Sequence, residues 1–379
     1  MLLAEIEATN FRNLTGKIVC GPQLNIIYGN NGHGKTSWLE AIHVLARTKS
    51  FRTQRLQEVI RFGERVATIE GRVLAGANLE RELQVILQDN SKNIFVNAKR
   101  ESLARYLSQL QVFSFTAPDL DVVRGMPEAR RRFLDRGVAS IRPAYLQTIV
   151  DYGKVVKQKN KLLQVANENE FSLEKVEDLV APWNEQLIRL AVVIHAEREG
   201  YVRGLNAALE RQLFDRRNLS ARYVSSLEGK GDLSDYESLL RSRIDLRLTT
   251  ELAAGHSLVG PHRDDVEILL DGHEIRIYGS SGQQRSTLLL LDLAAISLYN
   301  LASNEHPVFV IDDVDAELDE RRIRSLLEYL ENRTQTFITT SKKSHVEGFF
   351  SRAGVYEIED GRVLSSNDRN SAAQVGSIA

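Results

Sequence analysis

The stretch Asn25–Glu40, which reads NIIYGNNGHGKTSWLE, decides the fold of this 379-residue chain. The segment Leu24–Tyr28, which overlaps the start of this stretch, is mostly apolar and predicts a short buried strand. Gly29–Thr36 matches the phosphate-loop pattern, in which a glycine, four free positions and a second glycine precede Lys and Ser or Thr. A helix is expected from Ser37 through about Ala46. Strand, glycine-rich loop and helix in this order predict a nucleotide-binding site.

The residue types in this loop suit the binding of phosphate groups for physical reasons. Glycines let the loop wrap with its backbone N–H groups pointing inward, and the start of the helix adds about half a positive charge. Lys35 is expected to reach the β- and γ-phosphates, and the hydroxyl of Thr36 to bind Mg²⁺. The alternative is a glycine-rich turn that matches by chance, which the flanking strand and helix argue against. The expected nucleotide-binding residues are Gly29, Asn30, Asn31, Gly32, His33, Gly34, Lys35, Thr36 and Ser37.

Composition limits the class of protein to which this chain can belong. Hydrophobic residues make up 42 % of the chain, and a net charge of −2 means that any nucleic-acid-binding surface must be local. The single cysteine, Cys20, excludes a disulfide framework and suits a reducing, cytoplasmic location. The most apolar run, Thr287–Tyr299, is short for a membrane span and contains Asp292, so we expect a buried helix and no membrane partner.

The middle of the chain has a different pattern from its ends. Before it, alternating runs within 66–96 predict antiparallel strands. From Asp119 to about Leu252 the pattern is almost entirely helical, with one helix expected over Ala144–Val165 and a second starting near Pro182. Strands return beyond it, where Asp271-Gly272 predicts a hairpin between Val266–Leu270 and His273–Tyr278.

A second acidic motif follows the buried strand expected at Val308–Ile311. Asp312, at the end of that strand, can hold the hydration shell of Mg²⁺ beside Thr36, and Asp313 can polarise the attacking water. Because Lys35 and Asp312 are far apart in sequence, a domain must be inserted between them. We therefore expect an ATPase domain built from residues 1–118 and 253–379, and an inserted helical domain over 119–252.

Ser280, Gly282 and Gln283 place small residues and free N–H groups at the start of another long helix. One nucleotide does not need two such helix ends from one subunit. A second end is useful if it faces the γ-phosphate held by another copy, which predicts a homodimer with ATP sandwiched at its interface. The alternative is an ordinary Ser/Gly helix start.

Basic residues are concentrated between positions 130 and 161, where the sequence has nine of them and only two acidic residues, Asp135 and Asp151. This local excess predicts a footprint for a phosphate backbone, and a solvated helix face is the alternative. The nine residues are Arg130, Arg131, Arg132, Arg136, Arg142, Lys154, Lys157, Lys159 and Lys161.

These motifs, in this order, resemble the ABC-type ATPase heads of the SMC family, and within it the RecF family of recombination mediators. The resemblance covers nearly the whole chain. It rests on NFRN at 10–13, GNNGHGKTS at 29–37, KSFRT at 49–53, RRRFLD at 130–135, QKNKLL at 158–163, GPHRDD at 260–265, SSGQQR at 280–285 and IDDVDAELD at 311–319.

The resemblance implies a fold, a set of site residues and partners. The fold would be an α/β ABC-type P-loop ATPase head with an antiparallel β subdomain and an inserted, mostly α-helical domain. Arg12 would lie near the nucleotide, Lys35, Asp313 and Ser280 would act in ATP hydrolysis, and Thr36 and Asp312 would hold Mg²⁺. Ala316 departs from the serine common in the family's dimer-contact loop. The implied activity is a weak, DNA-stimulated ATPase whose ATP-bound dimer binds double-stranded DNA near gaps and helps RecO and RecR load RecA.

Two relatives with similar ATPase heads are disfavoured. SMC structural heads carry much longer coiled-coil arms than the insertion at 119–252 allows. Nucleases of the overcoming-lysogenization-defect type need a separate acidic metal domain, and little sequence follows Asp319. Residues 337–341, FITTS, also lack the switch histidine of transporter ATPases, which fits a slow switch better than a fast motor.

Overall fold

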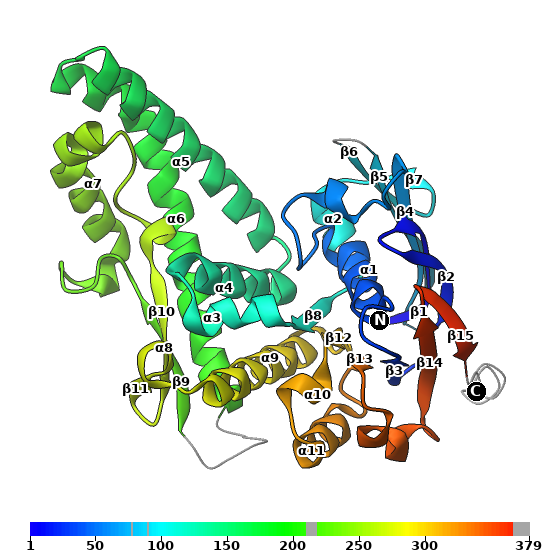
Figure 1. Cartoon of the computed structure of the whole chain (residues 1–379). Helices are drawn as coiled ribbons and strands as arrows, with labels where there is room; N and C mark the ends of the chain where they lie inside the picture. The colour runs from blue at the N-terminus through cyan, green and yellow to red at the C-terminus, as the bar shows by residue number, and fades with distance from the viewer. Residues whose placement is uncertain (77–78, 89–90, 210–217, 367–379) are drawn as a thin grey trace. The chain divides into compact units, whose positions relative to one another are not determined.

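The computed structural model describes residues 1–76, 79–88, 91–209 and 218–366 (Figure 1). The chain forms two compact units, one from Met1–Leu120 with the segment from Leu288 onward, and the other from Asp121–Thr287. Residues 253–287, expected with the ATPase domain, belong to the helical unit. The loose tail expected from Ser365 lies almost wholly outside the described residues.

The first unit contains two six-stranded sheets. One is entirely antiparallel, in the order β2-β1-β4-β5-β6-β7, and the other, in the order β15-β14-β3-β13-β12-β8, is parallel except for its edge strand β15. The first comprises β1 (Leu2–Phe11), β2 (Leu14–Val19), β4 (Val66–Ala75), β5 (Leu79–Gln88), β6 (Ser91–Val96) and β7 (Lys99–Arg100). The second comprises β3 (Leu24–Tyr28), β8 (Val112–Phe115), β12 (Val308–Ile311), β13 (Gln335–Thr340), β14 (Ala353–Glu359) and β15 (Arg362–Ser366).

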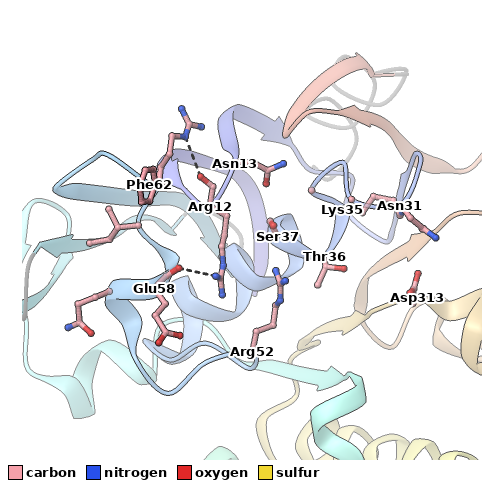
Figure 2. A pocket seen from close by; sticks show the side chains of 15 residues that line it. Arg12, Asn13, Asn31, Lys35, Thr36, Ser37, Arg52, Glu58, Phe62 and Asp313 are labelled. Carbon is pink, nitrogen blue, oxygen red and sulfur yellow. Dashed lines mark hydrogen bonds between the residues drawn. The ribbon is translucent and has the colours of Figure 1, made fainter.

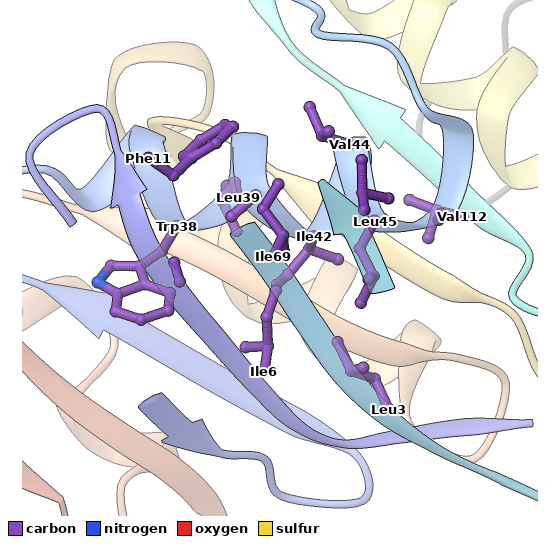
Figure 3. Packing of buried hydrophobic residues seen from close by; sticks show 14 of the residues in the cluster. Leu3, Ile6, Phe11, Trp38, Leu39, Ile42, Val44, Leu45, Ile69 and Val112 are labelled. Atoms are coloured by element: carbon purple, nitrogen blue, oxygen red, sulfur yellow. The ribbon is translucent and has the colours of Figure 1, made fainter. Parts of the chain in front are cut away.

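The helix α1 (Lys35–Arg47) contacts both sheets and forms the centre of this unit's core. Its apolar residues Leu39, Ile42 and Leu45 are fully buried and belong to one cluster with side chains of the antiparallel sheet, as Figure 3 shows. Gly71 in β4 makes the close approach possible, because a Cβ there would lie 2.3 Å from Cδ2 of Leu45. Each such buried aliphatic side chain stabilises the fold by roughly 1.5–3 kcal/mol.

Shorter helices complete the first unit, and one long helix begins at its boundary. The long helix α9 (Ser281–Ser303) extends well beyond the apolar run seen in the sequence. By length and composition it could cross a membrane, but 61 % of its most apolar window is buried, which is typical of a core helix. The shorter helices are η1 (Leu56–Val59), α2 (Leu103–Leu107), η2 (Ala117–Leu120), α10 (Val314–Glu317), α11 (Glu320–Leu330), η5 (Lys343–His345) and η6 (Glu347–Phe349).

The second unit is mostly helical, with one small sheet in the order β11-β10-β9. Its long helices α5 and α6 pack against each other as the expected helical hairpin. The helices are α3 (Asp121–Arg124), α4 (Pro127–Ile141), α5 (Tyr145–Glu168), α6 (Leu173–Leu209), η3 (Leu233–Asp235), α7 (Tyr236–Ala254), η4 (Pro261–Arg263) and α8 (Ile275–Tyr278). The strands are β9 (Leu219–Val224), β10 (Asp265–Leu270) and β11 (His273–Glu274).

Three local expectations for this unit were wrong. α6 begins at Leu173 rather than near Pro182, which lies inside the helix. Val176 and Val180, upstream of the proline, are buried in a cluster with α5 and α7, and this packing outweighs the hydrogen bond that proline removes. β9 lies within the stretch that showed no strand pattern and pairs with β10, a partner distant in sequence. Residues 275–278 form α8 rather than the end of a strand.

The expected hairpin turn between β10 and β11 is present. Asp271 and Gly272 have φ values of 53° and 81°, and the two-residue type I′ turn requires positive φ at both positions. The antiparallel β subdomain, the parallel ATPase sheet and the helical insertion together confirm the predicted fold class.

Candidate nucleotide-binding site

A cavity of about 910 Å³ opens at the phosphate loop of the first unit (Figure 2). This volume lies within the range usual for sites that hold small molecules and cofactors. Lys35, Thr36 and Asp313 line it, and Arg12 and Arg52 come from neighbouring segments. The structure therefore brings into one cavity residues that are separated by most of the chain.

The phosphate loop turns where the sequence places its glycines. Gly29 has φ 152°, and a Cβ there would lie 2.4 Å from the carbonyl oxygen of Ile358 in β14. Gly34 has φ 100°, and a Cβ there would lie 2.9 Å from Nδ2 of Asn13. Both positions combine a left-handed backbone with close neighbours, so a side chain would displace the loop.

The ammonium group of Lys35 lies inside the curve of the loop. Its Nζ donates to the carbonyl oxygens of Gly29 at 2.8 Å and Asn30 at 3.0 Å, and to Oδ1 of Asn31 at 3.3 Å. Burial lowers the pKa of Lys35, whereas the carboxylates of Asp313, Asp315 and Asp312 oppose this shift. The loop thus holds a positive charge within its curve, at the position where the lysine of a phosphate loop binds phosphates.

Asp312 lies at the end of β12, directly beside Thr36. Its Oδ1 accepts hydrogen bonds from the hydroxyls of Thr36 at 2.9 Å and Thr339 at 2.7 Å. Burial raises the pKa of Asp312, and these two hydrogen bonds oppose the rise. Adjacent hydroxyl and carboxylate oxygens are the ligands that Mg²⁺ prefers, so Thr36 and Asp312 fit a magnesium site.

Asp313 differs from its neighbour because it is exposed and lines the cavity. Its backbone is left-handed, with φ 52°, and its N–H donates to Oγ1 of Thr339 at 2.7 Å. The Thr339 hydroxyl therefore accepts from the backbone of Asp313 and donates to the carboxylate of Asp312. This arrangement leaves the Asp313 carboxylate available to accept a proton from water.

Arg12 lines the cavity through a tightly held guanidinium group. Its Nε and Nη2 donate to both carboxylate oxygens of Glu40, at 3.0 and 2.8 Å, and its Nη1 donates to the carbonyl oxygen of Glu58 at 2.9 Å. Glu40 has no exposed side-chain surface, and Ser50 and Arg52 also donate to it. Planar, paired hydrogen bonds of this kind fix the orientation of an arginine.

A family model described as "RecF/RecN/SMC N terminal domain" matches residues 2–363. Over 376 residues, the chain is 35 % identical to the DNA replication and repair protein RecF of Shouchella clausii strain KSM-K16, covering 96 % of this chain and 99 % of the relative. The chain belongs to the RecF family. The RecF of Staphylococcus epidermidis strain RP62A is 34 % identical over 382 residues, covering 96 % of this chain and all of the relative.

Solved structures agree with this assignment. The structure of the recombination mediator protein RecF with ATP, described as part of the RecFOR pathway, has a TM-score of 0.86 and 30 % identity and covers 96 % of this chain and 97 % of its own. An Smc head bound to the C-terminal winged-helix domain of ScpA has a TM-score of 0.54 at 14 % identity, covering 97 % of this chain and 98 % of its own, which shows a shared fold alone.

Ser280, Gly282 and Gln283, which the sequence placed at a second helix end, lie in the second unit at the start of α9. Oγ of Ser280 accepts from the N–H of Gln283 at 3.3 Å, and Oε1 of Gln283 accepts from the N–H of Ser280 at 2.8 Å. This reciprocal pair is a capping box, which stabilises the helix start. Gly282 is exposed, and a Cβ added to it would have no neighbour within 4 Å.

Two features of the phosphate-loop surroundings escaped the sequence analysis. The first is Thr339, which links both aspartates. The second is the turn between β14 and β15, where the N–H of Gly361 donates to the carbonyl oxygen of His33 at 2.8 Å. A Cβ on Gly361 would lie 2.1 Å from the carbonyl oxygen of Asn13. The Asp-Gly pair at 360–361 signals a hairpin in the sequence, but nothing local shows that it packs on the loop.

Most of the basic cluster at 130–161 is engaged within the protein. Arg130 pairs with Asp265 at 2.7 Å, and Lys159 pairs with Glu251 at 2.7 Å with both side chains fully buried. Arg131 donates to the carbonyl oxygen of Asp264. Further ion pairs join Arg132 to Glu128, Arg142 to Glu197 and Lys154 to Asp151. Arg130, Arg131 and Lys159 therefore join separate segments of the second unit, whereas Arg132 and Lys154 pair on the surface of their own helices.

Proposed function

We propose that this chain is an ATP-dependent, DNA-binding recombination mediator of the cytoplasm. In this proposal an ATP-bound homodimer binds double-stranded DNA near single-strand gaps and helps RecO and RecR load RecA. Slow ATP hydrolysis then releases the dimer from DNA. The observation that carries the proposal is the cavity in which Lys35, Thr36 and Asp313 lie together beside Asp312. The matched RecF structure, described as an ATP form within the RecFOR pathway, supports ATP as the ligand and RecO and RecR as partners.

The roles of the residues follow from their positions. The loop N–H groups and Lys35 would bind the β- and γ-phosphates. Thr36 and Asp312 would hold Mg²⁺, which supplies charge neutralisation on the phosphates when bound. Asp313 would orient the attacking water from the exposed side of the cavity. Arg12, held by Glu40, would contribute a fixed positive charge near the nucleotide.

The dimer is supported by the chemistry of the second helix end. A glycine in the first turn of α9 lowers helix stability relative to alanine by up to about 1 kcal/mol. Gly282 has an ordinary helical position and open space where a side chain would be, so no contact within its unit explains the glycine. Close approach by a phosphate group held on a second copy does explain it, and exposed Ser280 lies beside it.

Double-stranded DNA as a partner is supported mainly by membership of the RecF family. The ion pairs within the second unit leave a smaller basic surface than the sequence indicated. Lys157 and Lys161 are exposed along α5 and are the members of the cluster best placed to meet a phosphate backbone.

Light scattering with and without ATP tests the dimer, and a nucleotide-binding assay runs in parallel. The wild type should bind ATP and double in mass. Lys35→Arg should impair binding, whereas Ser280→Arg should bind ATP normally and remain monomeric, because the bulky cation would block the partner's γ-phosphate. The matched control is Ser238→Arg, at an exposed position in the first turn of α7, which should dimerise. Normal dimerisation of Ser280→Arg would show that the start of α9 does not act across an interface.

A further inference from the structure

Phe62 is an aromatic side chain that the fold does not use. Its relative exposure of 103 % is the highest among the large apolar side chains of the described residues. A side chain so exposed contributes almost nothing to folding, because none of its surface leaves water. Single exposed apolar residues are common on protein surfaces, so the exposure alone has no consequence. Its location, however, is on the wall of the nucleotide cavity.

The turn that carries Phe62 is held firmly. The N–H of Glu64 donates to the carbonyl oxygen of Arg61 at 3.0 Å, and Gly63 supplies the φ of 87° that the third position of a type II turn requires. Arg61 anchors this turn from three sides. Its N–H donates to the carbonyl oxygen of Asn10 at 2.8 Å, its Nε to that of Arg12 at 3.2 Å, and its Nη2 to that of Leu14 at 2.7 Å.

The same arginine therefore ties the turn to Arg12, whose own side chain lines the cavity. Figure 2 shows Phe62 and Lys35 on opposite sides of Arg12, within one cavity. Lys35 marks the end at which phosphates would bind. The cavity lining also includes Phe62 and Ile60, which are apolar, and the polar or charged side chains of Gln57, Glu58 and Arg61. An aromatic ring on such a wall gives a base a face to stack on, and the polar side chains around it can hydrogen-bond to the edge of the base.

We infer that Phe62 forms the nucleobase subsite of this cavity, with its ring stacked against the base of the bound nucleotide. The inference rests on the proposed function, since it assumes that the phosphate loop holds the triphosphate. Two observations beyond the loop carry it: the full exposure of the ring, and the rigid turn that presents it. The turn fixes the backbone of Phe62, so binding has to order only the rotamer of its ring.

Stacking of a base on an aromatic ring does not depend on which base it is, because every base has a π-face. Phe62 should therefore strengthen the binding of ATP and GTP alike. It should have no effect on inorganic tripolyphosphate, which has the phosphates of ATP without the base. This contrast separates the Phe62 subsite from the phosphate loop.

The experiment measures the dissociation constants of ATP and tripolyphosphate for the full chain in the presence of Mg²⁺. Phe62→Ala should weaken ATP binding about tenfold and leave tripolyphosphate binding unchanged, and Phe62→Trp should retain the ATP affinity of the wild type. Lys35→Ala should weaken both ligands. The matched control is Leu301→Ala, an exposed apolar residue on α9 that does not line the cavity, which should change neither.

Two outcomes would overturn the inference: ATP binding by Phe62→Ala equal to that of the wild type, or an equal loss of ATP and tripolyphosphate binding. Because the ring is fully exposed, Phe62→Ala should unfold at the same temperature as the wild type, and a lower melting temperature would count against the free ring described here. Failure of the proposed function gives a different result, in which the wild type binds neither ligand.

Discussion

Replacing Thr339 by valine tests the link between the two aspartates. Valine keeps the size and β-branched shape of threonine but removes the hydroxyl. Two hydrogen bonds of 2.7 Å are then lost, one to the carboxylate of Asp312 and one from the backbone N–H of Asp313. A bond to a charged group contributes about 1.5–3 kcal/mol and a neutral one about 0.5–1.5 kcal/mol. We expect the free energy of unfolding to fall by about 3 kcal/mol.

The same change should slow ATP hydrolysis more than it weakens ATP binding. Thr339 does not line the cavity, but it orients the carboxylate expected to hold Mg²⁺ and the backbone that carries Asp313. A misplacement of catalytic groups by about 1 Å can lower a rate about a hundredfold. We therefore expect at least about a tenfold drop in turnover, with the dissociation constant of ATP within about twofold of the wild type.

Urea unfolding and a phosphate-release assay measure the two effects. The matched control is Thr336→Val in the same strand, where the buried hydroxyl shares a hydrogen bond of 2.6 Å with that of Thr334 and contacts neither aspartate. The control should lose about 1 kcal/mol of stability and keep its turnover. If Thr339→Val hydrolyses ATP at the wild-type rate, the bridging role assigned to this hydroxyl is refuted.

Two further predictions concern the turn at Gly361, which packs on the phosphate loop, and the dependence of stability on pH. Gly361→Ala should lower the free energy of unfolding by about 2 kcal/mol or more and weaken ATP binding, because its Cβ would strike backbone packed on the phosphate loop. The matched control is Gly272→Ala, because Gly272 has the same φ of 81° but open space around it. This control should lose only about 1 kcal/mol of stability in urea unfolding and bind ATP normally. Equal effects of the two variants would show that the turn at Gly361 does not support the phosphate loop. Burial lowers the pKa of His262 from 6.5 to about 4, and Tyr152 and Ser257 satisfy its neutral ring. Between these pKa values the unfolded chain binds a proton that the folded chain does not, so stability should fall by about 3 kcal/mol as the pH drops through this window. His262→Gln should flatten that part of the stability–pH curve measured by urea unfolding, and an unchanged slope would show that other groups cause it.

Local sequence was sufficient for the parts of the site that lie within one segment. The phosphate loop, its strand and its helix depend on glycine spacing and apolar periodicity, which are visible over a dozen residues. The Asp271-Gly272 turn was predictable for the same reason, since two adjacent residues supply both positive φ values. The strand before Asp312 was equally clear, because four apolar residues in a row precede an acidic pair.

Local sequence did not predict the features that depend on contacts between residues distant in sequence. β9 was missed because its stability comes from β10, and the early start of α6 was missed because packing overrides the signal of Pro182. The basic cluster at 130–161 suggested a larger DNA-binding surface than the structure leaves. Its partners, such as Asp265 for Arg130 and Glu251 for Lys159, lie about a hundred residues away in sequence and cannot be assigned from a charge run.

The sequence alone determined that this chain has a phosphate loop, an acidic strand end and an inserted helical region, because each is encoded by short-range spacing. Only the tertiary structure decided that Thr339 joins the two aspartates, that the turn at Gly361 closes on the loop, and that Phe62 stands exposed on the cavity wall. The physical reason is that hydrogen-bond partners and exposure depend on which distant segments the sheets and the core bring together.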